Sequence, residues 1–231
     1  MDITTFTGAL PDVQALGWDR GDNLQLLPAN GTLQDVEPEL WRRGDGPLRL
    51  QQALQPLLHA FDVIVIDTPP TLGLFMQAPL VASTDLLIPV DVGYFSFEGM
   101  RQLLDAIARM RQEVPLTFET THILLTKFDA RTTLFAHVRA ILWEHCGAAV
   151  LHTVIHANVD LVRAQMAHQS IFAYDRTSRG AQEYQQVVEE LLGTRRAVEA
   201  SGTVLPFRHP RRGPGGRKEP RSGRTAHADS R

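Results

Sequence analysis

Two polar side chains follow apolar runs at positions where they could do chemistry. Asp67 comes directly after Phe61–Ile66, and Asn158 comes shortly after Val150–Ile155. A carboxylate at the end of a buried strand can hold Mg²⁺ through water and orient a phosphate group, although an Asp there caps the following turn equally well. The amide of Asn158 offers a donor and an acceptor, which is the pairing that the edge of adenine requires. These residue types point to a nucleotide as ligand.

The loop after Asp67 contains two consecutive prolines, Pro69 and Pro70. Because proline fixes its own φ and restricts the residue before it, this loop is stiff. A stiff loop suits a switch that holds two discrete states, and it equally suits a simple rigid turn. The sequence does not separate these two interpretations.

The elements that position these side chains alternate between strand and helix. Near-continuous apolar runs predict strands that are buried on both faces, at Phe61–Ile66, Leu86–Val90, His122–Thr126 and Val150–Ile155. Helical periodicity predicts helices at Leu48–Leu58, Leu74–Ala82, Phe97–Arg111, Thr132–His145, Val159–His168 and Ser178–Leu192. This order predicts a three-layer α/β/α fold with a mostly parallel sheet, which binds ligands at the carboxyl ends of its strands.

The composition is that of a soluble globular protein. The 231 residues are 43% hydrophobic, and no apolar run approaches the length of about 18 residues that a membrane span needs. The single cysteine, Cys146, excludes an intrachain disulfide framework. We therefore expect a cytoplasmic protein without a membrane role.

The net charge of −3 hides an asymmetry between the body and the C-terminal end. Residues 208–231 contain eight Lys or Arg and two Asp or Glu, which leaves 15 basic and 24 acidic residues in 1–207. Because the end of the chain is rich in Pro, Gly and Arg, it lacks the apolar surface needed for ordering. We predict an irregular segment over 1–22, a nucleotide-binding domain over 23–202 and a disordered basic tail over 203–231.

Five segments, in order, resemble the signatures of the ParA family of partition ATPases, within the ParA/MinD-type deviant Walker A superfamily. They are Phe61–Gly73 (Walker B and switch), Leu87–Val90 with Tyr94–Gly99, Leu124–Thr132, Ile155–Val159 and Tyr174–Ala181. Together they cover roughly residues 23–192. One of these segments departs from the family pattern, because the Pro-Arg-Asn of the family is His156-Ala157-Asn158 here, without the Arg and the contact it would make.

The resemblance implies ATP and Mg²⁺ as cofactors, a nucleotide-sandwich dimer and a ParB-like centromere-binding partner. It places Asp67, Thr68, Pro69, Asn158 and Asp175 at the nucleotide, with Asp67 holding Mg²⁺ through water. It also implies binding of nonspecific DNA at the nucleoid, in the partitioning of a chromosome or a plasmid. The candidate phosphate contacts are Arg131, Arg163, Arg176 and Arg179 in the body and Arg211, Arg212, Arg217 and Lys218 in the tail.

The family's Walker A loop, Lys-Gly-Gly-x-x-Lys-Thr, does not occur in these residues. The only lysines are Lys127 and Lys218, and Gly-Lys occurs nowhere. We therefore expect a P-loop NTPase-like fold that lacks its first strand, P-loop and first helix, with no retained catalytic residue. Without the phosphate cradle, we expect no ATP hydrolysis by this chain alone.

Three explanations stay open at this point. The sequence could start at an internal Met of a complete ParA-type protein, or it could be an inactive fragment. The third is a non-catalytic pseudo-ATPase that binds DNA through its tail or pairs, as a homodimer or heterodimer, with a full-length ParA. The in-frame DNA upstream would discriminate between them.

Overall fold

The computed structural model describes residues 18–19, 24–29, 31–69, 71, 73–91, 94–114, 116, 118, 120–129 and 134–201. The predictions for the segment before residue 18, for Arg131 and for the tail after residue 202 lie outside these residues. Within them, the chain forms a small antiparallel pair, β1 (Trp18–Asp19) and β2 (Gln25–Leu26), followed by helices and a separate parallel sheet.

The parallel sheet has the order β3-β4-β5, with β3 at Asp85–Asp91, β4 at Thr120–Phe128 and β5 at Val150–His156. Ile88 lies opposite Ile123, and Phe128 lies opposite His156. Three of the four predicted strands are therefore confirmed; β3 is longer by one residue and β4 by two residues at each end, and β5 by one residue at its C-terminal end. The predicted α/β class with a parallel sheet is confirmed with them.

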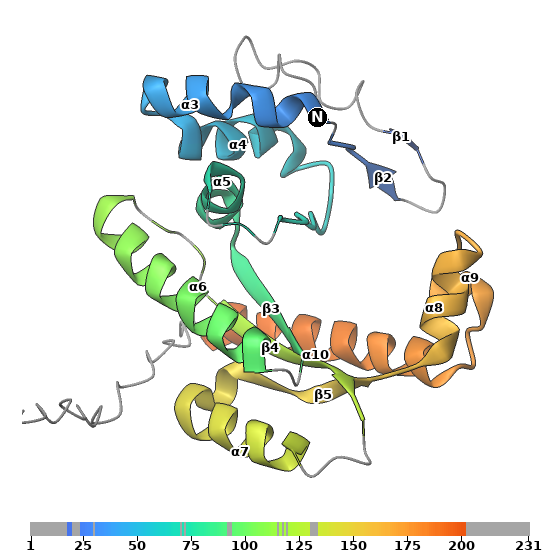
Figure 1. The fold of residues 1–231 in the computed structure, drawn as a ribbon. Coiled ribbons are helices and arrows are strands. Elements are labelled where there is room, and N and C mark those ends of the chain that lie inside the picture. Colours follow the sequence, from blue (N-terminus) through green and yellow to red (C-terminus); the bar gives the residue numbers. More distant parts are fainter. Residues whose placement is uncertain are drawn as a thin grey trace, which may run out of the picture.

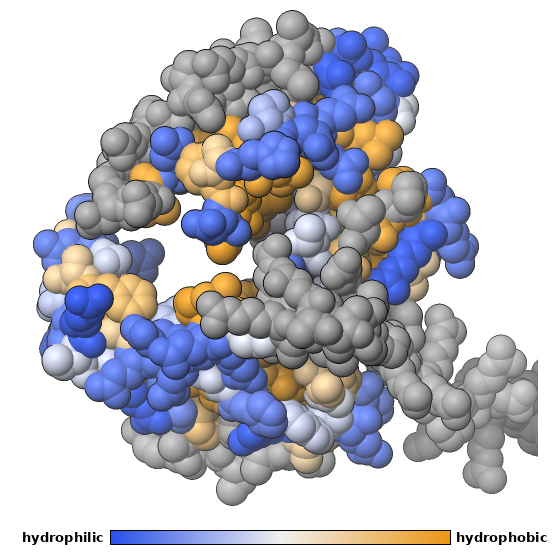
Figure 2. Space-filling model, turned by 180° about the vertical axis from the view of Figure 1, so that it is seen from behind, coloured by the Kyte–Doolittle hydropathy of each residue, from blue (hydrophilic) through white to orange (hydrophobic). Residues whose placement is uncertain are grey.

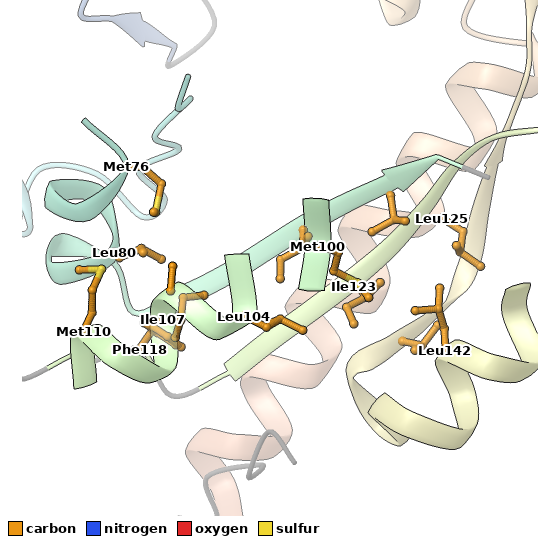
Figure 3. Packing of buried hydrophobic residues seen from close by; sticks show 14 of the residues in the cluster. Met76, Leu80, Met100, Leu104, Ile107, Met110, Phe118, Ile123, Leu125 and Leu142 are labelled. Carbon is orange, nitrogen blue, oxygen red and sulfur yellow. The ribbon is translucent and has the colours of Figure 1, made fainter. Parts of the chain in front are cut away.

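Helices cover both faces of this sheet (Figure 1). Ile123 and Leu125 of β4 pack in one cluster with α6 (Tyr94–Glu113) and α7 (Leu134–Cys146), which Figure 3 shows at close range. Leu124 points the other way and packs with Val187 of α10 (Arg179–Ser201). Because adjacent residues of β4 join different clusters, the sheet is buried on both sides, as the continuous apolar runs predicted.

A second hydrophobic cluster lies beside the first and is built from shorter helices. It joins η1 (Gly31–Val36), α3 (Glu37–Arg43), α4 (Gly46–Leu54) and η2 (Gln55–Leu57) to α5 (Leu74–Ala82). Helix α5 belongs to both clusters, since Leu74 and Ala78 pack in the second while Met76 and Leu80 pack in the first. The predicted bounds of α5 are confirmed, and α4 with η2 fills most of the predicted helix Leu48–Leu58.

The predicted strand at Phe61–Ile66 is wrong. These residues form no strand, and Val65 is 88% exposed and Val63 57% exposed. Phe61, Ile64 and Ile66 pack against the second cluster, while the backbone from Asp62 to Pro69 makes no hydrogen bond to another described residue. A strand needs a neighbour to pair with, and β3, which follows through α5, pairs with β4 alone among the described residues. The apolar composition of the run was therefore not sufficient for strand formation.

The remaining described helices follow the sheet. The short η3 (Gly147–Ala149) precedes β5, and α8 (Val159–Met166) and α9 (Ile171–Tyr174) lie between β5 and α10. Figure 1 shows α8 and α9 together at the end of the sheet where β5 finishes. Among the described helices, none is both long and apolar enough to cross a bilayer.

Candidate functional site

The carboxyl ends of β4 and β5 are held together just before Asn158. The backbone N–H of Ala157 donates to the carbonyl oxygen of Phe128 over 2.9 Å. The rings of Phe128 and His156 lie 4.5 Å apart, centroid to centroid. The loop that carries Asn158 therefore leaves the sheet from a fixed point.

Asn158 is the N-cap of α8. Its Oδ1 accepts a hydrogen bond of 2.7 Å from the backbone N–H of Asp160, which satisfies one of the free donors of the first turn. Its Nδ2 lies beside Gly180 in the first turn of α10, because a Cβ added to Gly180 would come within 3.1 Å of that nitrogen. The side chain therefore bridges the starts of α8 and α10.

Asp175 forms the turn that leads into α10. Its Oδ1 accepts hydrogen bonds from the hydroxyl and the backbone N–H of Thr177, at 2.7 and 2.9 Å. These hydrogen bonds, from the Thr177 hydroxyl first, lower the pKa of Asp175 below its usual value, so the carboxylate is ionised at neutral pH. Ser178 then caps α10 by accepting from the N–H of Ala181 over 3.2 Å.

The structure thus brings two predicted site residues to the start of one helix. Asn158 and Asp175 both lie against the N-terminal turn of α10, and no hydrogen bond joins them directly. The close approach depends on Gly180, where a Cβ would come within 2.9 Å of Leu161 in α8. An ionised carboxylate and an amide at a helix start can accept from and donate to a heterocyclic base.

Two glutamates that the sequence analysis missed tie α10 to β5, the edge strand of the described sheet. Glu183 accepts from the N–H of His156, and Glu190 accepts from the N–H groups of His152 and Thr153. They lie seven residues apart with the buried Val187 between them, so they share one helix face. The sequence signal that could have identified them is the spacing of seven residues, which places both glutamates on the face of α10 that also carries the buried Val187.

The loop with Asp67, Thr68 and Pro69 is exposed and separate from Asn158 and Asp175. No hydrogen bond or ion pair joins Asp67 to either residue in the described part of the chain. The loop ends at α5, whose first N–H, of Leu74, donates to Glu37 over 3.0 Å. In Figure 2 a hollow opens between the part of the molecule that contains α3–α5 and the part that contains the sheet, with hydrophobic residues on its walls.

Asp67 is compatible with a magnesium ion that arrives with a nucleotide. The carboxylate is exposed and has no partner among the described residues, and Mg²⁺ on a nucleotide takes only one or two carboxylates beside phosphate oxygens and water. No group of three or more His, Cys, Asp or Glu in the described residues could form a metal site by itself.

The candidate DNA-contacting arginines differ in what they already bind. Arg163 contacts Asp160 at 3.2 Å, and Arg179 contacts Glu183 at 2.7 Å. Arg176 is exposed and has no partner among the described residues. The other candidates, Arg131, Arg211, Arg212, Arg217 and Lys218, lie outside them.

Comparison with known proteins gives matches over most of the chain. A family model described as an AAA domain matches residues 14–120. The chain is 35% identical over 170 residues to the sporulation initiation inhibitor protein Soj of Bacillus subtilis, which covers 74% of this chain and 67% of Soj. It is 32% identical over 169 residues to the chromosome partitioning protein ParA of Myxococcus xanthus, covering 73% of this chain and 60% of that protein.

A solved structure supports the fold. Cobyrinic acid a,c-diamide synthase from Mycobacterium smegmatis, with bound ADP and magnesium, superimposes with a TM-score of 0.66 at 26% identity. The match covers 86% of this chain and 72% of that one. The three-layer arrangement predicted from the sequence is thus that of a known nucleotide-binding protein.

Proposed function

Since this chain belongs to the ParA (Soj) family of chromosome-partitioning ATPases, we propose that it acts in the segregation of a chromosome or a plasmid. The observation that carries the proposal is the 35% identity to Soj over two thirds of the length of that protein. In this role the chain works in the cytoplasm, at the nucleoid, with a ParB-like centromere-binding partner.

The proposed nucleotide site is the start of α10. Asn158 donates from Nδ2 and accepts at Oδ1 toward the adenine edge, and the ionised Asp175 accepts from the exocyclic amine. ATP is the nucleotide, and Asp67, with Thr68 and Pro69 beside it, faces the phosphates and holds Mg²⁺ through water. Bound Mg²⁺ neutralises charge on the phosphate oxygens. The base side of this site is supported by geometry within the described residues, and the phosphate side by the free carboxylate of Asp67.

We do not propose ATP hydrolysis by these 231 residues alone. Phosphoryl transfer depends on a backbone cradle and on lysines that neutralise the phosphates. Of the two lysines, Lys127 has its Nζ 3.9 Å from Asp91, and Lys218 belongs to the basic tail. For these 231 residues we therefore propose nucleotide binding, in a homodimer across the nucleotide or in a heterodimer with a full-length ParA.

The proposed DNA interface combines Arg176 with Arg163, Arg179, Arg131 and the tail cations Arg211, Arg212, Arg217 and Lys218. Each cation that neutralises a phosphate releases a counterion, so binding is independent of sequence and sensitive to salt. Arg176 is the strongest single candidate in the described body, because the guanidinium groups of Arg163 and Arg179 already contact carboxylates.

Fluorescence anisotropy with unrelated DNA duplexes tests this interface. We expect similar affinity for each duplex and a steep loss of affinity as salt rises. Arg176→Ala should reduce the slope of log affinity against log salt by about one. Arg101→Ala is the matched control, because Arg101 is also exposed but lies within α6, where its guanidinium contacts Asp105 at 2.9 Å. Equal slopes for all three proteins would contradict a contact by Arg176.

The tail is tested separately by removing residues 206–231. This deletion takes away eight cations and two carboxylates, so we expect a large drop in affinity at low salt and a shallower salt dependence. Unchanged affinity after the deletion would exclude the tail from the interface.

A further inference from the structure

A buried carboxylate in α10 holds the residue at which this chain departs from the family pattern. His156 stands where the resemblance expects proline, so it brings a backbone N–H and a ring nitrogen that proline lacks. Both are satisfied by Glu183: the N–H donates to Oε2 over 2.8 Å, and Nδ1 lies 2.6 Å from Oε1. The side chains of His156 and Glu183 are only 17% and 10% exposed.

The charge of Glu183 is compensated within the same group of residues. Nε of Arg179 donates to Oε1 of Glu183 over 2.7 Å, so the carboxylate has partners on both oxygens. A buried carboxylate is stable only with such partners. The three side chains therefore depend on one another, and they link the first two turns of α10 to the end of β5.

His156, the β5 residue of this link, is separated from Asn158 by a single residue. Ala157, the residue between, donates its N–H to Phe128, and Asn158 itself packs beside Gly180 in the same helix turn. Each residue on the path from Glu183 through His156 and Ala157 to Asn158 is therefore held by a contact of its own. Any shift of His156 away from α10 would move Asn158 with it.

We propose that Glu183 is a positioning residue for the base-binding end of the nucleotide site. By holding the N–H and the ring of His156, it fixes Asn158 against α10, and the pair His156–Glu183 replaces the rigidity of the family's proline. This inference rests on the proposed function in one respect, which is the assignment of Asn158 to the nucleotide base.

The test uses Glu183→Val, His156→Pro and the double variant in the full chain. Glu183→Val leaves the N–H of His156 unsatisfied, and His156→Pro leaves Glu183 without two of its three donors. The double variant removes donor and acceptor together and restores the proline of the family pattern. We therefore expect both single changes to be harmful and the double variant to be close to wild type, a pattern of strong coupling.

Two readouts follow the position of Asn158. The first is hydrogen exchange at the amide of Asp160, which Asn158 caps, and we expect it to quicken about tenfold in each single variant and to recover in the double variant. The second is the dissociation constant of a fluorescent ATP analogue with Mg²⁺, which we expect to rise about tenfold in the single variants and to recover likewise.

Glu190→Val is the matched control. Glu190 lies on the same face of α10 and binds the N–H groups of His152 and Thr153, but it is distant along β5 from Asn158. It should lower stability while leaving exchange at Asp160 and nucleotide affinity unchanged. Equal effects of Glu190→Val and Glu183→Val, or no recovery in the double variant, would overturn the inference.

The two proposals fail in different ways. If the wild-type chain binds no nucleotide, the proposed nucleotide site is wrong, and exchange at Asp160 still decides whether Glu183 positions Asn158. If the wild type binds and Glu183→Val binds equally well, the nucleotide site stands and the role of Glu183 is refuted.

Discussion

At the scale of single residues, Asn158 makes a hydrogen bond in one helix and a packing contact with another. It caps α8 through Oδ1, and its Nδ2 faces the first turn of α10. The sequence predicted that Asn158 follows a strand, and in the structure it comes two residues after the last residue of β5. Its role toward a base remains a proposal, and it depends on how closely α8 and α10 approach at Gly180.

Replacing Gly180 with alanine tests this close approach. The new Cβ would lie 2.9 Å from Cγ of Leu161 and 3.1 Å from Nδ2 of Asn158, so one of them must move. We expect a loss of about 1–3 kcal/mol in the free energy of unfolding from overpacking, partly offset by the better helix propensity of alanine. Urea unfolding measures this, and affinity for an ATP analogue should fall with it.

Gly193→Ala in the same helix is the control. Beyond its chain neighbours and the backbone of its own helix, no described atom lies within 4 Å of the position of its added Cβ, so only helix propensity changes. We expect a gain of up to about 1 kcal/mol. If both substitutions stabilised the protein equally, the packing between Asn158, Leu161 and Gly180 would not be tight.

At the scale of elements, α10 closes an open sheet edge. Strand β5 is at the edge of the described sheet, and Glu183 and Glu190 accept from its outward N–H groups. Unpaired edge groups invite association with other chains, so a helix that supplies acceptors protects the edge. The sequence predicted the helix but not this contact, which depends on tertiary packing.

Glu190→Gln tests the edge contact through pH. Burial raises the pKa of Glu190, but hydrogen bonds from the N–H groups of His152 and Thr153 outweigh burial, so the net pKa is lowered. A lowered pKa means that the stabilisation is fully present above the ordinary value of 4.5 and is lost as pH falls through the folded value. The stability advantage of wild type over Glu190→Gln should therefore be largest at neutral pH and shrink toward pH 3.

Urea unfolding of both proteins at neutral pH and in acid measures this difference. An advantage that stays the same at both pH values would show that the charge of Glu190 does not contribute through the edge of β5.

The elements that sequence could predict are those decided by local pattern. Helix α5 lies between Gly73 and Ser83 as expected, and β4 and β5 follow from their apolar runs. Helix α3 was not predicted; Pro38 lies in its first turn, where a missing N–H costs nothing. The segment Phe61–Ile66 has the composition of a strand but no partner among the described strands, and pairing is a property of the whole sheet that local pattern cannot supply.

At the scale of the whole molecule, two hydrophobic clusters share α5, and charge is divided between an acidic body and a basic C-terminal end. The predicted division at residues 22 and 202 is not tested by the described residues. Asn158 and Asp175 both lie at the start of α10, whereas Asp67 lies in a loop whose preceding residues pack against the second cluster.

The 231-residue chain should release no phosphate from ATP above background in the presence of Mg²⁺. The reason is the absence of any Gly-Lys sequence that could cradle and neutralise the phosphates. A coupled phosphate-release assay measures this, with a full-length family member as positive control. Turnover that requires Mg²⁺ and disappears in Asp67→Ala would refute the prediction and would make Asp67 part of an active site.

If this chain takes part in DNA segregation, inheritance of the replicon that encodes it depends on the chain. The measurement is the fraction of cells that lose the replicon, or lack a nucleoid, per generation after an in-frame deletion of the coding sequence. We expect loss to increase clearly above the unmodified strain and to return to normal when the wild-type chain is supplied in trans. Unchanged inheritance after the deletion would rule out a role of this chain in segregation.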